Sequence, residues 1–196
     1  MKNSFFKISI ASIFSLLILS SGIMAQNNDK PRPSLMAGVS QRIGVDTDIT
    51  ISYSRPGVKE RKIWGELVPW GLAPGNKYSN DKPFPWRGGA NENTTIEFSK
   101  DVLIDGHKLS AGKYGMHFIP GKDKWTVIFS KNSELWGSYQ YNQEEDALRI
   151  EVEPQEAPFA EWLTYGFDKL AGTSCTAYLH WEKLRVSFSV SIDDAM

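Results

Sequence analysis

The stretch Leu184-Arg185-Val186-Ser187-Phe188-Ser189-Val190-Ser191-Ile192 decides the fold class. Apolar and polar residues alternate strictly along it, and this period of two is typical of a β-strand with one buried face. Aromatic and β-branched residues, which suit a half-buried pleated surface, fill the apolar positions. The same alternation recurs along the chain at residues 49–54, 95–98, 114–118, 125–129, 148–153, 162–167 and 177–181.

Turn residues separate these alternating segments. Asp105-Gly106 lies between two short apolar segments and predicts a tight hairpin. Glu182-Lys183 leaves two residues between the last two segments and predicts a second hairpin. Only residues 63–68 predict a short helix, because no long segment has apolar residues at helical spacing. The sequence therefore predicts an all-β fold: a single antiparallel two-sheet β-sandwich or jelly-roll-like domain over residues 35–192, with one long loop.

The first 25 residues predict export. Lys2 and Lys7 precede an apolar segment at 8–19, and small residues up to Ala25 follow it. This order is typical of a secretory signal peptide. A helix of twelve residues rises about 18 Å, less than the roughly 30 Å hydrocarbon core of a bilayer. We therefore expect cleavage, no transmembrane segment in the mature protein, and a periplasmic or extracellular location. Residues 26–34 are polar with two prolines and predict a flexible lead-in.

Charge and residue counts exclude several classes of protein. The 22 Lys and Arg against 23 Asp and Glu leave no basic surplus, so nucleic acid is not an expected partner. The chain has a single cysteine, Cys175, which excludes an intramolecular disulfide. Cys175 lies on the same face of its strand as Ala177, so we predict that it is buried and inert. His117 and His180 occupy the positions opposite the apolar residues, so we expect both to be exposed. No histidines have a metal-ligand spacing, so we predict no metal. The sequence contains no Gly-x-Ser-x-Gly motif, so we assign no catalytic residue and expect no other cofactor.

A long segment from Arg55 to Asn93 is rich in proline, glycine and aromatic residues. Long loops on a β scaffold often carry function. Basic residues cluster at its start, and Arg87, Asn91 and Glu92 form a dense polar group near its end. Two interpretations apply to that group: it lines a pocket for an anionic or hydroxylated ligand, or Arg87 pairs with Glu92 in a structural tie, which we favour. The candidate binding residues are Arg55, Lys59, Arg61, Trp64, Trp86, Arg87, Asn91 and Glu92.

Four strings in this order are distinctive: YSRPGVKERKIWGELVP at 53–69, WRGGANENTTIEF at 86–98, LSAGKYG at 109–115 and WTVIF at 125–129. Over residues 35–192 the chain resembles the secreted bacterial domain-of-unknown-function family 2911 (DUF2911), common in the Bacteroidetes. The resemblance implies a β-sandwich-like domain outside the cytoplasm. It supplies no activity, cofactor or catalytic residue. Residues 72–85 depart from the family pattern as an insertion, so a binding function that involves this loop can differ here.

These observations leave two main functions open. The first is a secreted, non-catalytic binding or structural module of the bacterial cell envelope, with a carbohydrate or another envelope component as the ligand of the 55–92 segment. The alternative is a small hydrolase that acts on a glycan or an ester in the same region. An enzyme of that kind would need two carboxylates about 5–9.5 Å apart in a concave site. An aromatic platform without such a pair would favour binding. A large exposed apolar patch would instead favour a structural partner in an envelope assembly. The oligomeric state is left open.

Overall fold

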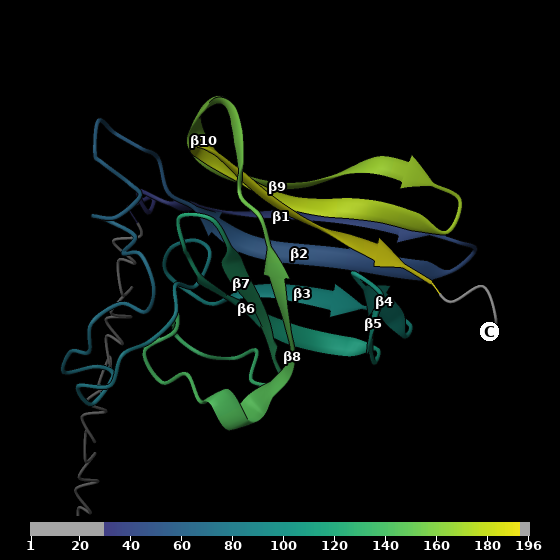
Figure 1. Cartoon of the computed structure of the whole chain (residues 1–196), viewed down its shortest axis with the longest axis horizontal. Coiled ribbons are helices and arrows are strands. Elements are labelled where there is room, and N and C mark those ends of the chain that lie inside the picture. The colour runs from purple at the N-terminus through teal and green to yellow at the C-terminus, as the bar shows by residue number, and fades with distance from the viewer. Residues whose placement is uncertain (1–29, 193–196) are drawn as a thin grey trace, which may run out of the picture. The chain divides into compact units, whose positions relative to one another are not determined.

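The computed structural model describes residues 30–192, so the expected signal peptide lies outside the described residues. Ten strands form two antiparallel sheets, which confirms the predicted β-sandwich (Figure 1). The six-stranded sheet has the order β1 (Leu35–Ile43), β2 (Thr47–Arg55), β3 (Thr94–Phe98), β6 (Gly112–Ile119), β7 (Trp125–Ser130), β8 (Asp146–Val152). The four-stranded sheet has the order β5 (His107–Leu109), β4 (Val102–Ile104), β10 (Ser174–Ser191), β9 (Gln155–Ala171).

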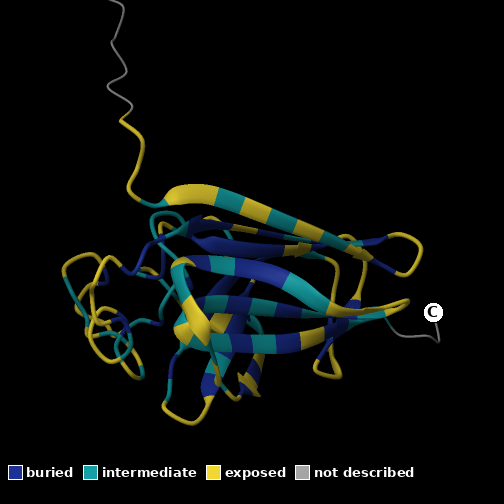
Figure 2. Cartoon of the chain, turned by 90° about the horizontal axis from the view of Figure 1, so that it is seen from above, coloured by how far each residue is buried: buried dark blue, intermediate teal, exposed yellow. Residues whose placement is uncertain are grey.

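The core lies between the two sheets. The alternating apolar residues of both sheets meet there, and most of them are almost fully buried. Leu179 and Cys175 of β10 are 1% and 2% exposed, so both occupy the interior as their alternation predicts. β1, by contrast, is an edge strand whose residues alternate between exposed and half-buried along most of its length (Figure 2). Its weak apolar pattern explains why the sequence does not mark it as a strand.

The predicted hairpin at Asp105-Gly106 is confirmed, because it joins β4 to β5. The second predicted hairpin, at Glu182-Lys183, is wrong: β10 continues through these residues. The register between β9 and β10 shifts on both sides of Glu182, which has a φ of 55°. This bulge exchanges the two faces of the strand, so Trp181 before it and Val186 after it are both buried despite opposite parity. The change of parity looks like a chain reversal in the sequence.

The predicted helix at residues 63–68 is also wrong. These residues form a compact turn in which Val68 N donates to Ile63 O at 2.9 Å and Trp64 pairs with Val68 in an isolated bridge. Gly65 has a φ of +85°, a conformation that a right-handed helix does not contain. Among residues 30–192, the one helical element is a single 3₁₀ turn, η1 (Gln143–Glu145). No helix in this described range is long and apolar enough to cross a membrane.

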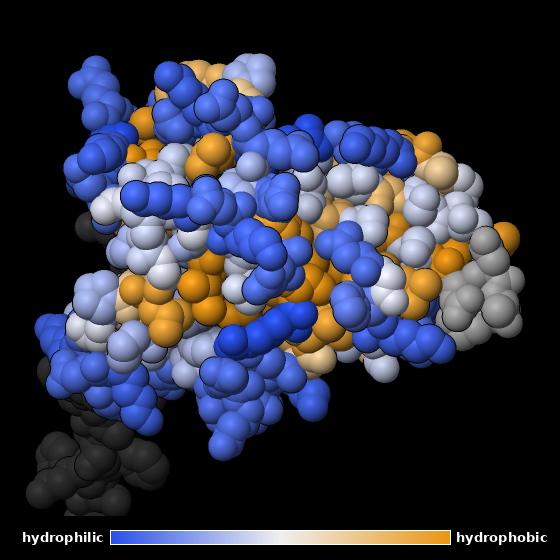
Figure 3. All heavy atoms as spheres, viewed as in Figure 1, coloured by the Kyte–Doolittle hydropathy of each residue, from blue (hydrophilic) through white to orange (hydrophobic). Residues whose placement is uncertain are grey.

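Two long connections lie at the same end of the sandwich. One joins β2 to β3 through residues 56–93, and the other joins β7 to β8 through residues 131–145 (teal and green at the left of Figure 1). They meet directly, because Asn93 N donates to Leu135 O at 3.2 Å. Figure 3 shows apolar surface between hydrophilic side chains at this end of the molecule. The fold thus gathers its irregular, aromatic-rich segments above one end of the two sheets.

Candidate binding site

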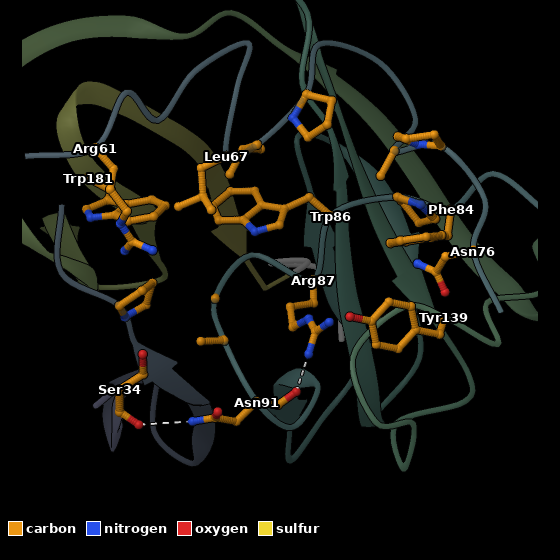
Figure 4. Close-up of a pocket in the computed structure, with 18 residues that line it drawn as sticks. Ser34, Arg61, Leu67, Asn76, Phe84, Trp86, Arg87, Asn91, Tyr139 and Trp181 are labelled. Atoms are coloured by element: carbon orange, nitrogen blue, oxygen red, sulfur yellow. Dashed lines mark hydrogen bonds between the residues drawn. The ribbon is translucent and has the colours of Figure 1, made fainter. Parts of the chain in front are cut away.

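The two long connections enclose an open cavity of about 530 Å³. This volume lies within the roughly 300–1,000 Å³ range of small-molecule sites. The segment after β2 supplies most of the lining; Figure 4 shows Trp181 of β10 beside Arg61 on one side and Tyr139 of the 131–145 connection beside Asn76 and Phe84 on the other. The lining consists of Ser34, Pro56, Arg61, Leu67, Val68, Pro69, Ala73, Pro74, Asn76, Phe84, Pro85, Trp86, Arg87, Gly89, Ala90, Asn91, Tyr139 and Trp181.

Arg87 is the best-anchored cation of this cavity. Its Nη1 donates to the backbone oxygen of Asn91, and its guanidinium carbon lies 5.1 Å from the centre of the Tyr139 ring. Gly137 packs against the same guanidinium so closely that an added Cβ would lie 2.2 Å from the Arg87 Cζ. Figure 4 shows the side chain of Arg87 between Trp86, Asn91 and Tyr139. The arginine is therefore held in one orientation while most of its N–H donors stay available to a ligand.

Arg61 supplies a second positive charge at the cavity. Its Nη2 donates to Gly57 O at 2.6 Å and its Nε donates to Val58 O at 3.1 Å. These bonds use two of the five N–H groups of the guanidinium, so three remain. Asn91 adds a polar group: its Nδ2 donates to Ser34 O at 3.0 Å, which leaves its side-chain oxygen as an acceptor. The lining contains two arginines and no Asp or Glu.

Aromatic rings form the apolar part of the cavity. The ring of Trp86 stacks on that of Trp181 with an interplanar angle of 16° and a centroid distance of 6.0 Å. Trp64 meets both rings edge-on and lies outside the lining. Trp125, which is fully buried in β7, meets Trp64 and Trp86 edge-on from the core side. This cluster fixes the exposed edge of Trp86 rigidly, because each ring is packed on several sides.

Four of the eight predicted binding residues come together in the cavity: Arg61, Trp86, Arg87 and Asn91. Trp64 supports them from below. Arg55 lies elsewhere and joins the two sheets, since its Nε donates to Leu163 O at 2.9 Å. Lys59 also lies outside the lining, where its ammonium is 5.9 Å from the centre of the Trp162 ring.

The expected ion pair between Arg87 and Glu92 is not the arrangement found. Glu92 pairs with Arg32, whose hydrogen bond is the main cause of the lowered pKa of the Glu92 carboxyl. Asn91 has a φ of 59°, so the chain turns between the two expected partners. Arg87 bonds to the turn through Asn91 O, while Glu92 and Asn91 fasten residues 32–34 of the expected lead-in. The part of the lead-in before residue 30 lies outside the described residues.

Tyr139 and Trp181 are the main cavity residues that sequence reasoning missed. Trp181 looks like an ordinary core residue of an alternating strand. Tyr139 lies in a non-alternating stretch after β7 that also holds Trp136 and Tyr141. Aromatic enrichment of a long connection, which singled out residues 55–93, would have singled out this stretch too. Asn76 and Phe84 fall in residues 72–85, the segment expected to depart from the family pattern, so this segment does contribute to the cavity.

His117 is buried, contrary to the exposed position that alternation predicted. The 131–145 connection covers this face of the six-stranded sheet, so the side chain is 0% exposed. Its Nδ1 lies 2.7 Å from Ser138 Oγ, and its ring meets Tyr141 edge-on at 5.3 Å. Burial, and next the charge of Arg87, lowers the His117 pKa to about 4. Ser138 is 1% exposed, so this Ser–His contact anchors the connection that carries Tyr139 rather than presenting a nucleophile to solvent.

Metal ligands are not clustered in the described part of the chain. Among residues 30–192, no group of three or more His, Cys, Asp or Glu side chains is placed to hold a metal ion. The cavity lining offers arginine, asparagine, serine and aromatic side chains, none of which is a preferred ligand of zinc. The arrangement can therefore bind a ligand through hydrogen bonds, positive charge and ring contacts.

Fold and cavity together define a β-sandwich protein with an open, arginine-bearing cavity at one end of its sheets. The chain belongs to the family described as Protein of unknown function (DUF2911), which matches residues 34–190. The resemblance drawn from the sequence strings is thereby confirmed. A search of curated proteins and a search of solved structures each gave no match.

Proposed function

We propose that this protein is a non-catalytic binding module for glycans that contain uronic acids, and that the cavity beside Arg87 is its binding site. The observation that carries the proposal is the composition of the lining: aromatic rings, two arginines and two asparagines, without a carboxylate. The expected signal peptide supports a location outside the cytoplasm, where such glycans occur as envelope or environmental polysaccharides.

Each group of the lining matches one part of an acidic sugar. The flat ring of Trp86 and the ring of Tyr139 suit the apolar face of a pyranose, since aromatic side chains contribute large contact area at low entropic cost. Asn91 and Asn76 offer amide groups to hydroxyls. An arginine binds a carboxylate through two parallel, charge-assisted hydrogen bonds, which are stronger than the hydrogen bonds that it donates to the neutral hydroxyls of a sugar. The lining therefore favours a ligand with an apolar face and a negative edge.

The same lining argues against the hydrolase alternative. Glycoside cleavage in most families uses a pair of carboxylates about 5–9.5 Å apart, and no Asp or Glu belongs to the cavity lining. Glu92, which directly follows Asn91 of the lining, is engaged with Arg32. An esterase would need an accessible nucleophile beside a general base. Ser34 shares the lining with no His, Asp or Glu, and Ser138 is buried beside His117. Binding without chemistry is the function that these groups support best.

The test is calorimetric titration with oligosaccharides of hyaluronan, alginate and pectate, which together carry four different uronic acids. Each is compared with its own carboxyl-reduced form, in which the carboxylates are alcohols. We expect at least one acidic series to bind and its reduced form to bind at least about tenfold more weakly, because a charge-assisted bond is worth roughly 1.5–3 kcal/mol. Equal binding of both forms, or no binding of any series, would overturn the proposal.

Variants locate the binding. Arg61→Gln should weaken acidic binding and keep the fold, because Arg61 is exposed and bonds only backbone oxygens. Arg87→Gln should weaken it further. Arg42→Gln is the matched control, since Arg42 pairs with Asp48 on β1 and β2 and lies outside the cavity. An Arg42 variant that loses as much affinity as the Arg61 variant would show that charge acts non-specifically.

A further inference from the structure

We infer that the site continues past Tyr139 into a second subsite over Trp136, and that the ligand is therefore an oligosaccharide chain rather than a single sugar. This inference rests on the proposed glycan binding and adds the length of the ligand. A second hollow of about 300 Å³ adjoins the first cavity. Its lining is Tyr78, Glu134, Leu135, Trp136, Tyr139 and Gln140, so Tyr139 belongs to both hollows.

Exposed aromatic rings mark this second hollow. Trp136 and Tyr78 are each 60% exposed, although both are large side chains that usually find cover. The ring of Tyr139 connects Tyr78 to the first cavity: its centroid lies 5.6 Å from that of Tyr78 and 5.0 Å from that of Phe84, while Trp136 shares the lining of the second hollow with both tyrosines. A continuous aromatic surface therefore leads from Phe84 in the first hollow to the second. Consecutive sugar units of one chain can rest on such a surface as successive bases rest on aromatic side chains.

Both walls of the second hollow are fixed by hydrogen bonds. Within residues 72–85, Tyr78 N donates to the side-chain oxygen of Asn76 at 2.8 Å, and Asp81 N donates to Asn76 O at 2.9 Å. On the other wall, Leu135 O accepts from Asn93 N at 3.2 Å. A surface that is already ordered loses little conformational entropy on binding, which favours affinity.

Charge distinguishes the two hollows. Glu134 is the single charged residue that lines the second one, and its carboxylate lies 3.2 Å from the Lys113 ammonium. The two charges offset each other at the rim. The second hollow therefore selects by contact area and not by charge, whereas Arg61 and Arg87 give the first its preference for a negative group. One chain that fills both gains the second contact without a second loss of translational freedom.

The experiment is a length series. Di-, tetra- and hexasaccharides of hyaluronan, alginate and pectate are titrated against the native protein, Trp136→Ala and Trp162→Ala. Trp136 is exposed, so its truncation should leave the fold intact, as an unchanged urea midpoint would verify. Trp162 is the matched control, because it is 43% exposed on β9 and lines neither hollow.

We expect affinity to rise at least about tenfold from di- to tetrasaccharide in the native protein and in Trp162→Ala. In Trp136→Ala this gain should disappear while disaccharide binding stays unchanged. Binding without any dependence on length, or a gain that survives in Trp136→Ala, would overturn the second subsite and leave the proposed function standing. No binding by any series would overturn both.

Discussion

His117 is a buried side chain of β6 that connects the six-stranded sheet to the 131–145 connection. Its imidazole contacts Ser138, the residue directly before Tyr139. The positive charge of Arg87 also contributes to the lowered pKa of His117. Protonation would place a second positive charge in a closed, dry environment, which is why the His117 pKa falls to about 4. The neutral ring is therefore the form that the folded protein requires.

A pH dependence of stability follows from this shift. The folded protein holds the His117 pKa at about 4, below the ordinary value of 6.5, so the unfolded chain binds the proton more readily. The stabilisation is complete above about pH 6.5 and is lost as the pH falls towards 4, by roughly 3 kcal/mol in total. Urea unfolding at pH 7.5 and pH 4.5 measures it.

His117→Gln should show a smaller loss between these pH values than the native protein, because it removes the titrating group. His107→Gln, at an exposed position on β5, should keep the native slope. If the two variants lose stability equally on acidification, His117 does not titrate as its burial requires.

At the scale of elements, the connection between β7 and β8 positions Arg87. Gly137 has a φ of +69° and lies against the guanidinium. Gly71 has a similar φ of +81°, but an added Cβ there would meet no atom within 4 Å. Both glycines therefore have a positive φ, but only Gly137 lies against a side chain, that of Arg87.

Gly137→Ala should therefore cost more stability than Gly71→Ala. Both pay about 1–2 kcal/mol for a side chain in the left-handed region. Only Gly137→Ala also displaces Arg87, so it alone should weaken the binding of uronic acid oligomers. Calorimetric titration and urea unfolding of both variants separate the two effects. Equal loss of binding in both would mean that the contact with Gly137 does not position Arg87.

The long strand β10 holds the four-stranded sheet together, because it pairs with both β4 and β9. Leu179→Ala in its buried half should cost about 2–5 kcal/mol, the usual effect of truncating a buried leucine. Leu170→Ala on β9 is the matched control, since Leu170 is 60% exposed and should cost within about 0.5 kcal/mol. Similar urea midpoints for the two would contradict the assignment of the inner face.

Alternation predicts elements where one face is buried and fails where that condition changes. It identifies β6, β7 and the buried half of β10, because the two faces of these strands differ in composition. It misplaces His117, since a loop distant in sequence covers the second face. It predicts a hairpin at Glu182, where β10 instead has a bulge, because either feature moves the apolar residues from odd to even positions. Arg61, Trp86, Arg87 and Asn91 were predictable from local composition, and the same signal marks the aromatic-rich connection that holds Tyr139. Trp181 joins them only through tertiary packing.

At the scale of the whole molecule, the export of the chain stays a prediction from the sequence. The segment before Gln26 has the charge, apolar length and small residues of a signal peptide. N-terminal sequencing of the exported protein should begin at or near Gln26. A membrane-bound product that still begins at Met1 would contradict it.

We propose that the end of the sandwich bounded by the two long connections is a binding site for acidic glycans. A crystal structure of the protein with a uronic acid tetrasaccharide, chosen as the tightest binder of the three series, tests this proposal most directly. We expect one sugar ring against Trp86 with its carboxylate on Arg87, and the chain continuing past Tyr139 towards Trp136. A tetrasaccharide bound instead at the hollow formed by Leu35, Met36, Ala37, Arg55 and Trp162, with the Arg87 cavity empty at saturation, would contradict it.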